Sequence, residues 1–174
     1  MNSLVLVSGT IIIIVFSWFF SIKYKRYHGI VRFFSFESIF ILLLLNYRFW
    51  FFDPFSIHQL ISWTFLIASV FPGISGYLLL KRKGKSEDSF ENTTVLVKTG
   101  VYKYIRHPLY CSLLLFGTGV MFKHMWTLQI ILGAVNITAI FLTALIEEGE
   151  MISKFGVDYK EYMKETKMFI PSII

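Results

Sequence analysis

Charged residues are scarce in this 174-residue chain, at 16% of the sequence, against about 25% in soluble globular domains. Hydrophobic residues make up 55%, and the mean hydropathy is +0.63. A soluble domain of this length could not bury so much apolar surface, so lipid must be the solvent for much of it. The shortage of charge therefore excludes a disordered chain and a soluble nucleic-acid-binding domain.

Cysteine is almost absent, because the sequence contains only Cys111. A single thiol cannot form an intrachain disulfide, which excludes a disulfide-stabilised secreted module. Histidine, cysteine and acidic residues nowhere have metal-ligand spacing, and the sequence has no glycine-rich phosphate loop. We therefore predict no metal site and no nucleic-acid partner, and we interpret Cys111 as a small packed hydrophobic residue.

Long apolar runs predict membrane-spanning helices, because about 20 apolar residues in a helix cross the hydrocarbon core of a bilayer. The runs cover residues 4–22, 34–51, 60–80, 109–122 and 126–146. We therefore predict an all-α, polytopic membrane helical bundle with about five transmembrane helices. The first run lacks a basic segment before it and a small-residue cleavage site after it, which favours a retained span over a signal peptide.

The fourth run has 14 residues and would be about 21 Å long as a helix, too short to cross a bilayer alone. Either the helix begins earlier, near Tyr104, or the segment Arg106-His107-Pro108 lies at membrane depth inside the protein. In the second run, Glu37 and Arg48 are expected near the two ends, where a charge costs less.

The basic residues are unevenly placed along the chain. With five spans, 15 of the 17 lysine and arginine residues fall on one side of the membrane, and Arg48 and Lys123 fall on the other. Cytoplasmic loops are enriched in these residues, which predicts an outside N-terminus and a cytoplasmic C-terminus. We expect an integral, multi-pass protein of the plasma membrane in a prokaryote or of the endoplasmic reticulum in a eukaryote.

The polar C-terminal region still contains apolar residues at steps of three and four. This stripe predicts an amphipathic helix at the cytoplasmic interface that ends before Pro171; its members are Met151, Ile152, Phe155, Tyr159, Tyr162 and Met163. We interpret residues 1–174 as one membrane-embedded domain, with three spans in residues 1–80 and a functional half in residues 81–174.

Two short stretches on the predicted cytoplasmic side carry the unusual residues. In the first, Arg106 and His107 precede Pro108, which favours the first turn of a helix, and a helix N-terminus favours an anion. A basic membrane flank with interfacial tyrosines is the simpler alternative. In the second, Glu147, Glu148 and Glu150 follow the last span, on the side that favours basic residues. There the alternative is a helix end whose acids pair with Lys154 or Arg106.

These stretches resemble the membrane methyltransferase superfamily that includes isoprenylcysteine carboxyl methyltransferases and phospholipid N-methyltransferases. One hallmark of that superfamily, Leu-Val-x-x-Gly-x-Tyr-x-x-x-Arg-His-Pro-x-Tyr, is present from Leu96 to Tyr110. A second consists of a Glu pair, Phe-Gly, two tyrosines and a late proline, and it is matched at Glu147, Glu148, Phe155, Gly156, Tyr159, Tyr162 and Pro171. The resemblance covers roughly the C-terminal half of the chain.

The resemblance implies an S-adenosylmethionine-dependent methyltransferase whose cofactor site is closed by the cytoplasmic loop and the C-terminal segment. It implies cofactor contacts at Thr94, Val95, Leu96, Val97, Tyr102, His107, Pro108, Leu109, Tyr110 and Glu147. For the catalytic step, Arg106 and Glu148 are the nearest candidates to handle a proton. The implied partner is a lipophilic acceptor that comes from the bilayer, either isoprenylcysteine carboxylate-like or a lipid.

Two positions depart from the carboxyl methyltransferases, in which an arginine is thought to hold the substrate carboxylate. Thr143 and Met168 stand where those enzymes have or often have arginine, so the bidentate carboxylate clamp is missing. A lipid amine, a quinone-like or thiol acceptor, or a carboxylate held by Lys167 therefore stays open. An NADPH-dependent sterol-type membrane reductase and a non-enzymatic membrane scaffold are the alternative functions.

Overall fold

In the computed structural model, which describes residues 3–24, 26–85 and 93–173, the chain is helical almost throughout. Its described α-helices are α1 (Ser3–Phe20), α2 (His28–Asn46), α3 (Ile57–Lys83), α4 (Pro108–Met121), α5 (Thr127–Phe155) and α6 (Val157–Glu165). Short 3-10 helices, η1 (Ile22–Tyr24), η2 (Tyr47–Phe49) and η3 (Gly100–Lys103), lie between them. The predicted all-α membrane bundle is confirmed.

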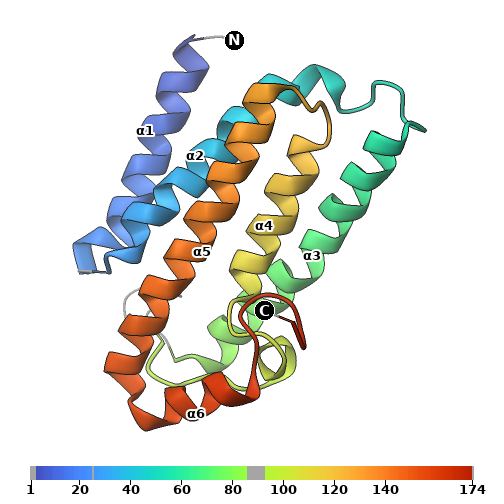
Figure 1. The fold of residues 1–174 in the computed structure, drawn as a ribbon. Coiled ribbons are helices and arrows are strands. Elements are labelled where there is room, and N and C mark those ends of the chain that lie inside the picture. Colours follow the sequence, from blue (N-terminus) through green and yellow to red (C-terminus); the bar gives the residue numbers. More distant parts are fainter. Residues whose placement is uncertain (1–2, 25, 86–92, 174) are drawn as a thin grey trace.

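Five of these helices run up and down in one bundle, and α6 lies across one end of it (Figure 1). The most extensive helix contacts are those between α3 and α4 and between α2 and α5. Helix α1 packs mainly on α2. The connections from α1 to α2 and from α3 to α4 lie at the same end as α6, which we call the α6 end. Which end faces the cytoplasm stays a prediction.

Small and polar residues bring the helices close together, as is usual where lipid rather than water surrounds a bundle. A Cβ added to Gly76 of α3 would lie 2.9 Å from Pro108 of α4, so the third helix contacts the start of the fourth through bare backbone. Ser35 of α2 donates a hydrogen bond to Asn136 of α5 at 2.6 Å, and both are buried. These contacts fix the α2–α5 and α3–α4 pairs that carry the site.

Four helices are long and apolar enough to cross a membrane, and α4 is a shorter apolar helix. Because α4 begins at Pro108, the alternative that it starts near Tyr104 is wrong. His107 is 6% exposed and Arg106 is half-buried, as expected for a segment placed inside the protein. The short fourth helix therefore leaves room at the α6 end for a buried loop.

Two boundaries differ from the sequence prediction. Helix α2 begins at His28 rather than near residue 34, so Glu37 lies in the middle of a span, where it accepts a hydrogen bond from Thr10 at 2.7 Å. The predicted amphipathic stripe is divided between two helices, because Gly156, with φ 58°, ends α5 and begins α6. Positive φ is inexpensive only for glycine, and this turn lays α6 across the end of the bundle.

Candidate active site

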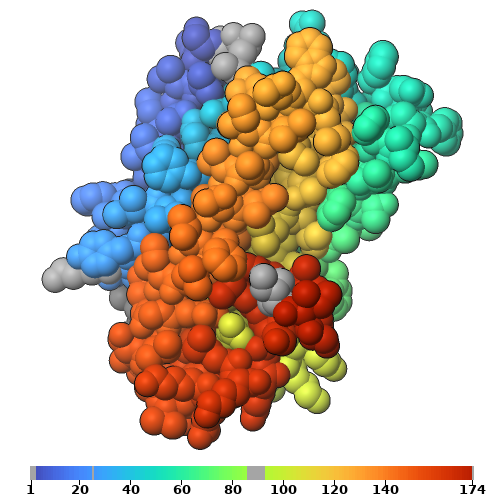
Figure 2. Space-filling model, viewed as in Figure 1, coloured from blue at the N-terminus to red at the C-terminus, as the bar shows by residue number. Residues whose placement is uncertain are grey.

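The segment before α4 is held in place by the C-terminal residues. Ile105 forms a parallel bridge with Lys167. The backbone N–H of Arg106 donates to the carbonyl of Lys167 at 2.8 Å, and that of His107 donates to Met168 at 3.1 Å. The space-filling view shows the C-terminal residues (red) beside the yellow-green residues of this loop (Figure 2). The chain end and the loop therefore form one unit.

The acids of α5 meet the basic residues of this loop. Arg106 donates from Nε to Glu148 Oε1 at 2.7 Å. The His107 ring lies between the two acids, with Nε2 3.3 Å from Glu148 Oε1 and Nδ1 3.6 Å from Glu147 Oε2. The alternative that these acids pair with Arg106 is thus true of Glu148, whereas Glu147 has other partners. Helix α5 also continues past the acids to Phe155, as expected of acids that do not stand at a helix C-terminus.

A second row of basic groups reaches the same acids from the start of α2. Arg26 lies 3.3 Å from Glu147 Oε1 and 3.6 Å from Glu150 Oε2. The His28 ring, which is fully buried, contacts Glu150 Oε2 at 2.8 Å. Glu147 therefore lies between cationic groups that come from two distant parts of the chain.

His107 is the ionisable centre of the cluster. Burial alone would lower the pKa of His107, but hydrogen bonds to Glu147 and Glu148 and the charges of these carboxylates outweigh burial and raise it above the ordinary value. The ring also stacks on Tyr110, with centroids 5.4 Å apart. The two acids thus favour the charged form of the imidazole, which also contacts an aromatic face.

A cavity opens beside this cluster, and its empty space is about 660 Å³ including the open mouth. Its lining residues come from α2, α3, the loop before α4, α4, α5 and α6; they are Arg32, Leu80, Thr93, Leu96, Val97, Tyr102, Arg106, His107, Pro108, Leu109, Tyr110, Glu147, Met151, Tyr159 and Tyr162. The cavity is the place where the two sequence motifs meet.

Tyrosines form much of the polar wall of this cavity. Tyr162 donates its hydroxyl to the carbonyl of Tyr102 at 2.6 Å, which joins α6 to η3. Burial raises the pKa of Tyr102, Tyr159 and Tyr162 well above the usual value, and the nearby charge of Glu147 adds to the effect at Tyr102. These phenols therefore stay neutral and act as hydrogen-bonding groups.

Most of the residues predicted as cofactor contacts line the cavity; they are Leu96, Val97, Tyr102, His107, Pro108, Leu109, Tyr110 and Glu147. Two do not. Thr94 is exposed and donates its hydroxyl to the carbonyl of Lys85, and Val95 is 42% exposed. Their neighbour Thr93 lines the cavity instead. Their predicted roles stay predictions.

The two predicted catalytic residues form an ion pair with each other. Arg106 lines the cavity, but its guanidinium also donates to the carbonyls of Met163 and Thr166. Glu148 does not line the cavity. This geometry gives the pair a part in fixing the C-terminal segment, and a part in proton transfer stays a prediction.

Several site residues were missed by sequence reasoning. Arg26, His28 and Arg32 belong to the flank of the second span, where basic residues were explained by topology alone. Arg32 could have given a signal, because it follows the first apolar residues of α2 and therefore belongs to the helix rather than to a loop. The sequence identifies Tyr159 and Tyr162 as motif residues but does not predict that they line the cavity.

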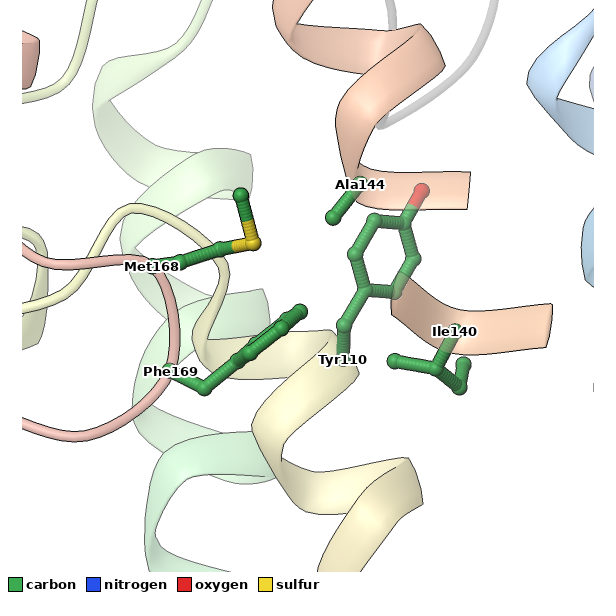
Figure 3. Packing of buried hydrophobic residues seen from close by; sticks show 5 residues of the cluster. All are labelled: Tyr110, Ile140, Ala144, Met168 and Phe169. Carbon is green, nitrogen blue, oxygen red and sulfur yellow. The ribbon is translucent and has the colours of Figure 1, made fainter. Parts of the chain in front are cut away.

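The two positions that depart from the carboxyl methyltransferases lie in an apolar region beside the cavity. Thr143 is fully buried and donates its hydroxyl to the carbonyl of Ala139 in its own helix. Met168 is 8% exposed and packs with Tyr110, Ile140, Ala144 and Phe169 (Figure 3). Lys167 is exposed and does not line the cavity. None of these three supplies a cation to the site.

Together, these features define a membrane-embedded helical bundle with a charged cavity, open on one side, at one end. The model of the isoprenylcysteine carboxyl methyltransferase (ICMT) family matches residues 86–153. Over this segment the chain is similar to the ICMT family, whose methyltransferases use S-adenosylmethionine.

A curated relative gives a second comparison. Methanethiol S-methyltransferase 1 of Bradyrhizobium diazoefficiens is 30% identical over 73 residues, which are 41% of this chain and 24% of the relative. The chain thus spans about a quarter of the length of that relative. No solved structure matches the chain.

The residues that line the pocket have the chemistry that this cofactor requires. Glu147 is an anion for an ammonium group, and the aromatic walls of Tyr102 and Tyr110 suit a flat base or a sulfonium. His107 and Arg32 supply positive charge for a carboxylate. The charges that line the pocket therefore fit those of S-adenosylmethionine.

Proposed function

We propose that this chain is an integral membrane methyltransferase that transfers a methyl group from S-adenosylmethionine to a lipophilic acceptor. The observation that carries the proposal is the pocket at the α6 end, where Glu147 and His107 face the same cavity and both lie within the segment that the family model matches.

The side chains act by binding and by excluding water. When bound, S-adenosylmethionine supplies a methyl group on a positively charged sulfonium. Glu147 binds the ammonium group, and the apolar residues Val97 and Leu109 keep the site dry, which favours a reaction that removes charge. Alignment of donor and acceptor supplies much of the rate enhancement, so the proposal needs no nucleophile from the protein.

The acceptor side of the pocket favours an apolar nucleophile over a carboxylate. Thr143 bonds within its helix and Met168 packs in an apolar cluster with Tyr110, so neither position can bind an anion. The curated relative is named for a thiol acceptor. We therefore place an apolar thiol first among acceptors, ahead of a prenyl-cysteine carboxylate and a lipid amine.

The proposal is tested with purified protein in detergent and S-adenosylmethionine labelled in its methyl group. Three acceptor classes are compared: alkyl and prenyl thiols, prenylated thio-acids, and extracted lipids that contain phosphatidylethanolamine. Label should pass to the thiols most rapidly and should not pass when Glu147→Gln replaces the wild type. Transfer of label to the prenylated thio-acids alone would instead indicate that the acceptor is a prenyl-cysteine carboxylate.

Controls separate the alternative functions. NADPH oxidation without methyl transfer would identify a sterol-type reductase. If the folded protein binds neither S-adenosylhomocysteine nor NADPH, the proposal is wrong and a scaffold role replaces it.

A further inference from the structure

Glu147 is held through both of its carboxylate oxygens, and one of the holding groups stands behind the cavity wall. Arg26 donates from Nη2 to Glu147 Oε1 at 3.3 Å, and the His107 ring lies 3.6 Å from the other oxygen, Oε2. Glu147 and His107 line the cavity, whereas Arg26 is not among the described residues that line it. The contact of Arg26 with the pocket is therefore indirect, through the carboxylate of Glu147.

Glu150, which follows Glu147 by three residues on α5, holds Arg26 in place. Its Oε2 lies 3.6 Å from Arg26 Nε and 2.8 Å from His28 Nδ1. Its Oε1 accepts a hydrogen bond at 3.4 Å from the backbone N–H of His28, the first residue of α2. The N–H groups at a helix N-terminus favour an acidic partner, and Tyr27 forms no side-chain capping bond with the described residues of α2. Glu150 therefore caps α2 from α5 and brings Arg26 beside Glu147.

The backbone of Arg26 is fixed by the turn between α1 and α2. Its N–H donates to the carbonyl of Ser21 at 3.1 Å, and the residue is 8% exposed. A Cβ added to Gly29 would lie 2.3 Å from the Ser21 Cβ, so the turn packs against α2 through bare backbone. Because its backbone and its guanidinium are both held, Arg26 can fix the direction of the carboxylate that it contacts.

We propose that Arg26 is a positioning residue, which keeps the carboxylate of Glu147 in the orientation that binds the ammonium group of the cofactor. The inference rests on the proposed function. Arg26 lies outside the segment that the family model matches, which begins at residue 86. Removing Arg26 releases Glu147 Oε1, and the carboxylate is then drawn toward His107 and away from the ligand. The turn between α1 and α2 thus takes part in cofactor binding without touching the cofactor.

Two ligands that differ only in the ammonium group test this role. S-Adenosylhomocysteine carries the ammonium, and its deaminated analogue keeps the adenosine and the carboxylate. Both are titrated calorimetrically against the wild type, Arg26→Gln and Arg26→Lys in detergent. The matched control is Arg48→Gln, which makes the same change at an exposed arginine beyond the C-terminal end of α2.

We expect Arg26→Gln to weaken the binding of S-adenosylhomocysteine about tenfold and to leave the binding of the deaminated analogue unchanged. Arg48→Gln should bind both ligands as the wild type does. Arg26→Lys keeps a cation but loses the planar fork, so its affinity for S-adenosylhomocysteine should lie between those of the wild type and Arg26→Gln. A side chain that served only the fold would change the affinity for both ligands by the same factor.

Two results overturn the inference and leave the proposed function intact. One is unchanged or tighter binding of S-adenosylhomocysteine by folded Arg26→Gln, and the other is equal weakening of both ligands. If Arg26→Gln does not fold, Arg26→Lys alone decides, because it must still weaken S-adenosylhomocysteine more than the analogue. Failure of the wild type to bind S-adenosylhomocysteine would instead overturn the proposed function itself.

Discussion

At one end of the bundle Lys123 is buried among aromatic rings, and at the other His107 is buried between acids. The Lys123 ammonium lies 3.7 Å from the centre of the Trp63 ring and donates to Gln59 Oε1 at 2.8 Å. Trp50 contributes a second ring and a carbonyl. Burial lowers the pKa of Lys123, whereas the acids around His107 raise its pKa.

The difference shows how a structural buried charge can be distinguished from a ligand-binding one in a chain that has few charged residues. The neighbours of Lys123 are rings, an amide and a carbonyl, which solvate a cation by themselves, so the group needs no ligand. At the α6 end, acids and cations alternate around a cavity, and changing one group alters the charge that a ligand meets. The first arrangement stabilises the fold, and the second is suited to binding a charged ligand.

Replacing Glu147 with Gln should have the largest effect. It removes the anion that faces the cavity and leaves Arg26 and His107 with one partner fewer. We expect the affinity for S-adenosylhomocysteine to fall by about 100-fold or more. The measurement is the rise in unfolding temperature on adding ligand, with exposed Glu161→Gln as the control. Unchanged ligand stabilisation in Glu147→Gln would remove Glu147 from the site.

Replacing Glu148 with Gln should act first on stability. It leaves Arg106 buried without its acid, 2.7 Å away in the wild type, which costs about 3 kcal/mol of unfolding free energy. The C-terminal segment should loosen as well, and limited proteolysis near Lys167 should speed up. A normal unfolding temperature together with lost activity would instead make Glu148 a group in the reaction.

Replacing Lys123 with Met tests the other end. A buried cation exchanged for an apolar group of similar length should change stability by at most about 1–2 kcal/mol. Ligand affinity should be unchanged, because the site lies at the opposite end of the bundle. Thermal unfolding and ligand titration measure the two effects. Weakened binding in this variant would show that the ends are coupled and would break the comparison.

The pH dependence of His107 should be the smallest effect. Its pKa in the folded chain lies above the unfolded value of about 6.5. Its contribution to stability is therefore complete below about pH 6.5 and is lost as the pH rises through the raised folded pKa. The difference in unfolding temperature between wild type and His107→Gln, a few degrees at about pH 6, should shrink in alkaline buffer. A constant difference would mean that His107 acts only by packing.

The helical bundle and the location of the site could be predicted from the sequence, because apolar runs and the Leu96–Tyr110 motif are local patterns. The contacts of Glu147 with Arg26 could not, since 121 positions separate the two residues. The uneven distribution of basic residues along the chain explains Arg26 and Arg32 by membrane topology alone, so the sequence does not indicate that they belong to a site. The start of α2 at His28 places Arg26 beside the acids and Arg32 on the cavity wall, and a helix boundary is the least certain part of a prediction from hydropathy.

The central claim is that the charged pocket at the α6 end binds S-adenosylmethionine. Calorimetric titration of the purified chain with S-adenosylhomocysteine tests it most directly, using wild type, Glu147→Gln and Lys123→Met side by side. The account predicts saturable binding at one site, lost in Glu147→Gln and kept in Lys123→Met. No binding by the folded wild type, or equal binding by all three proteins, would contradict it.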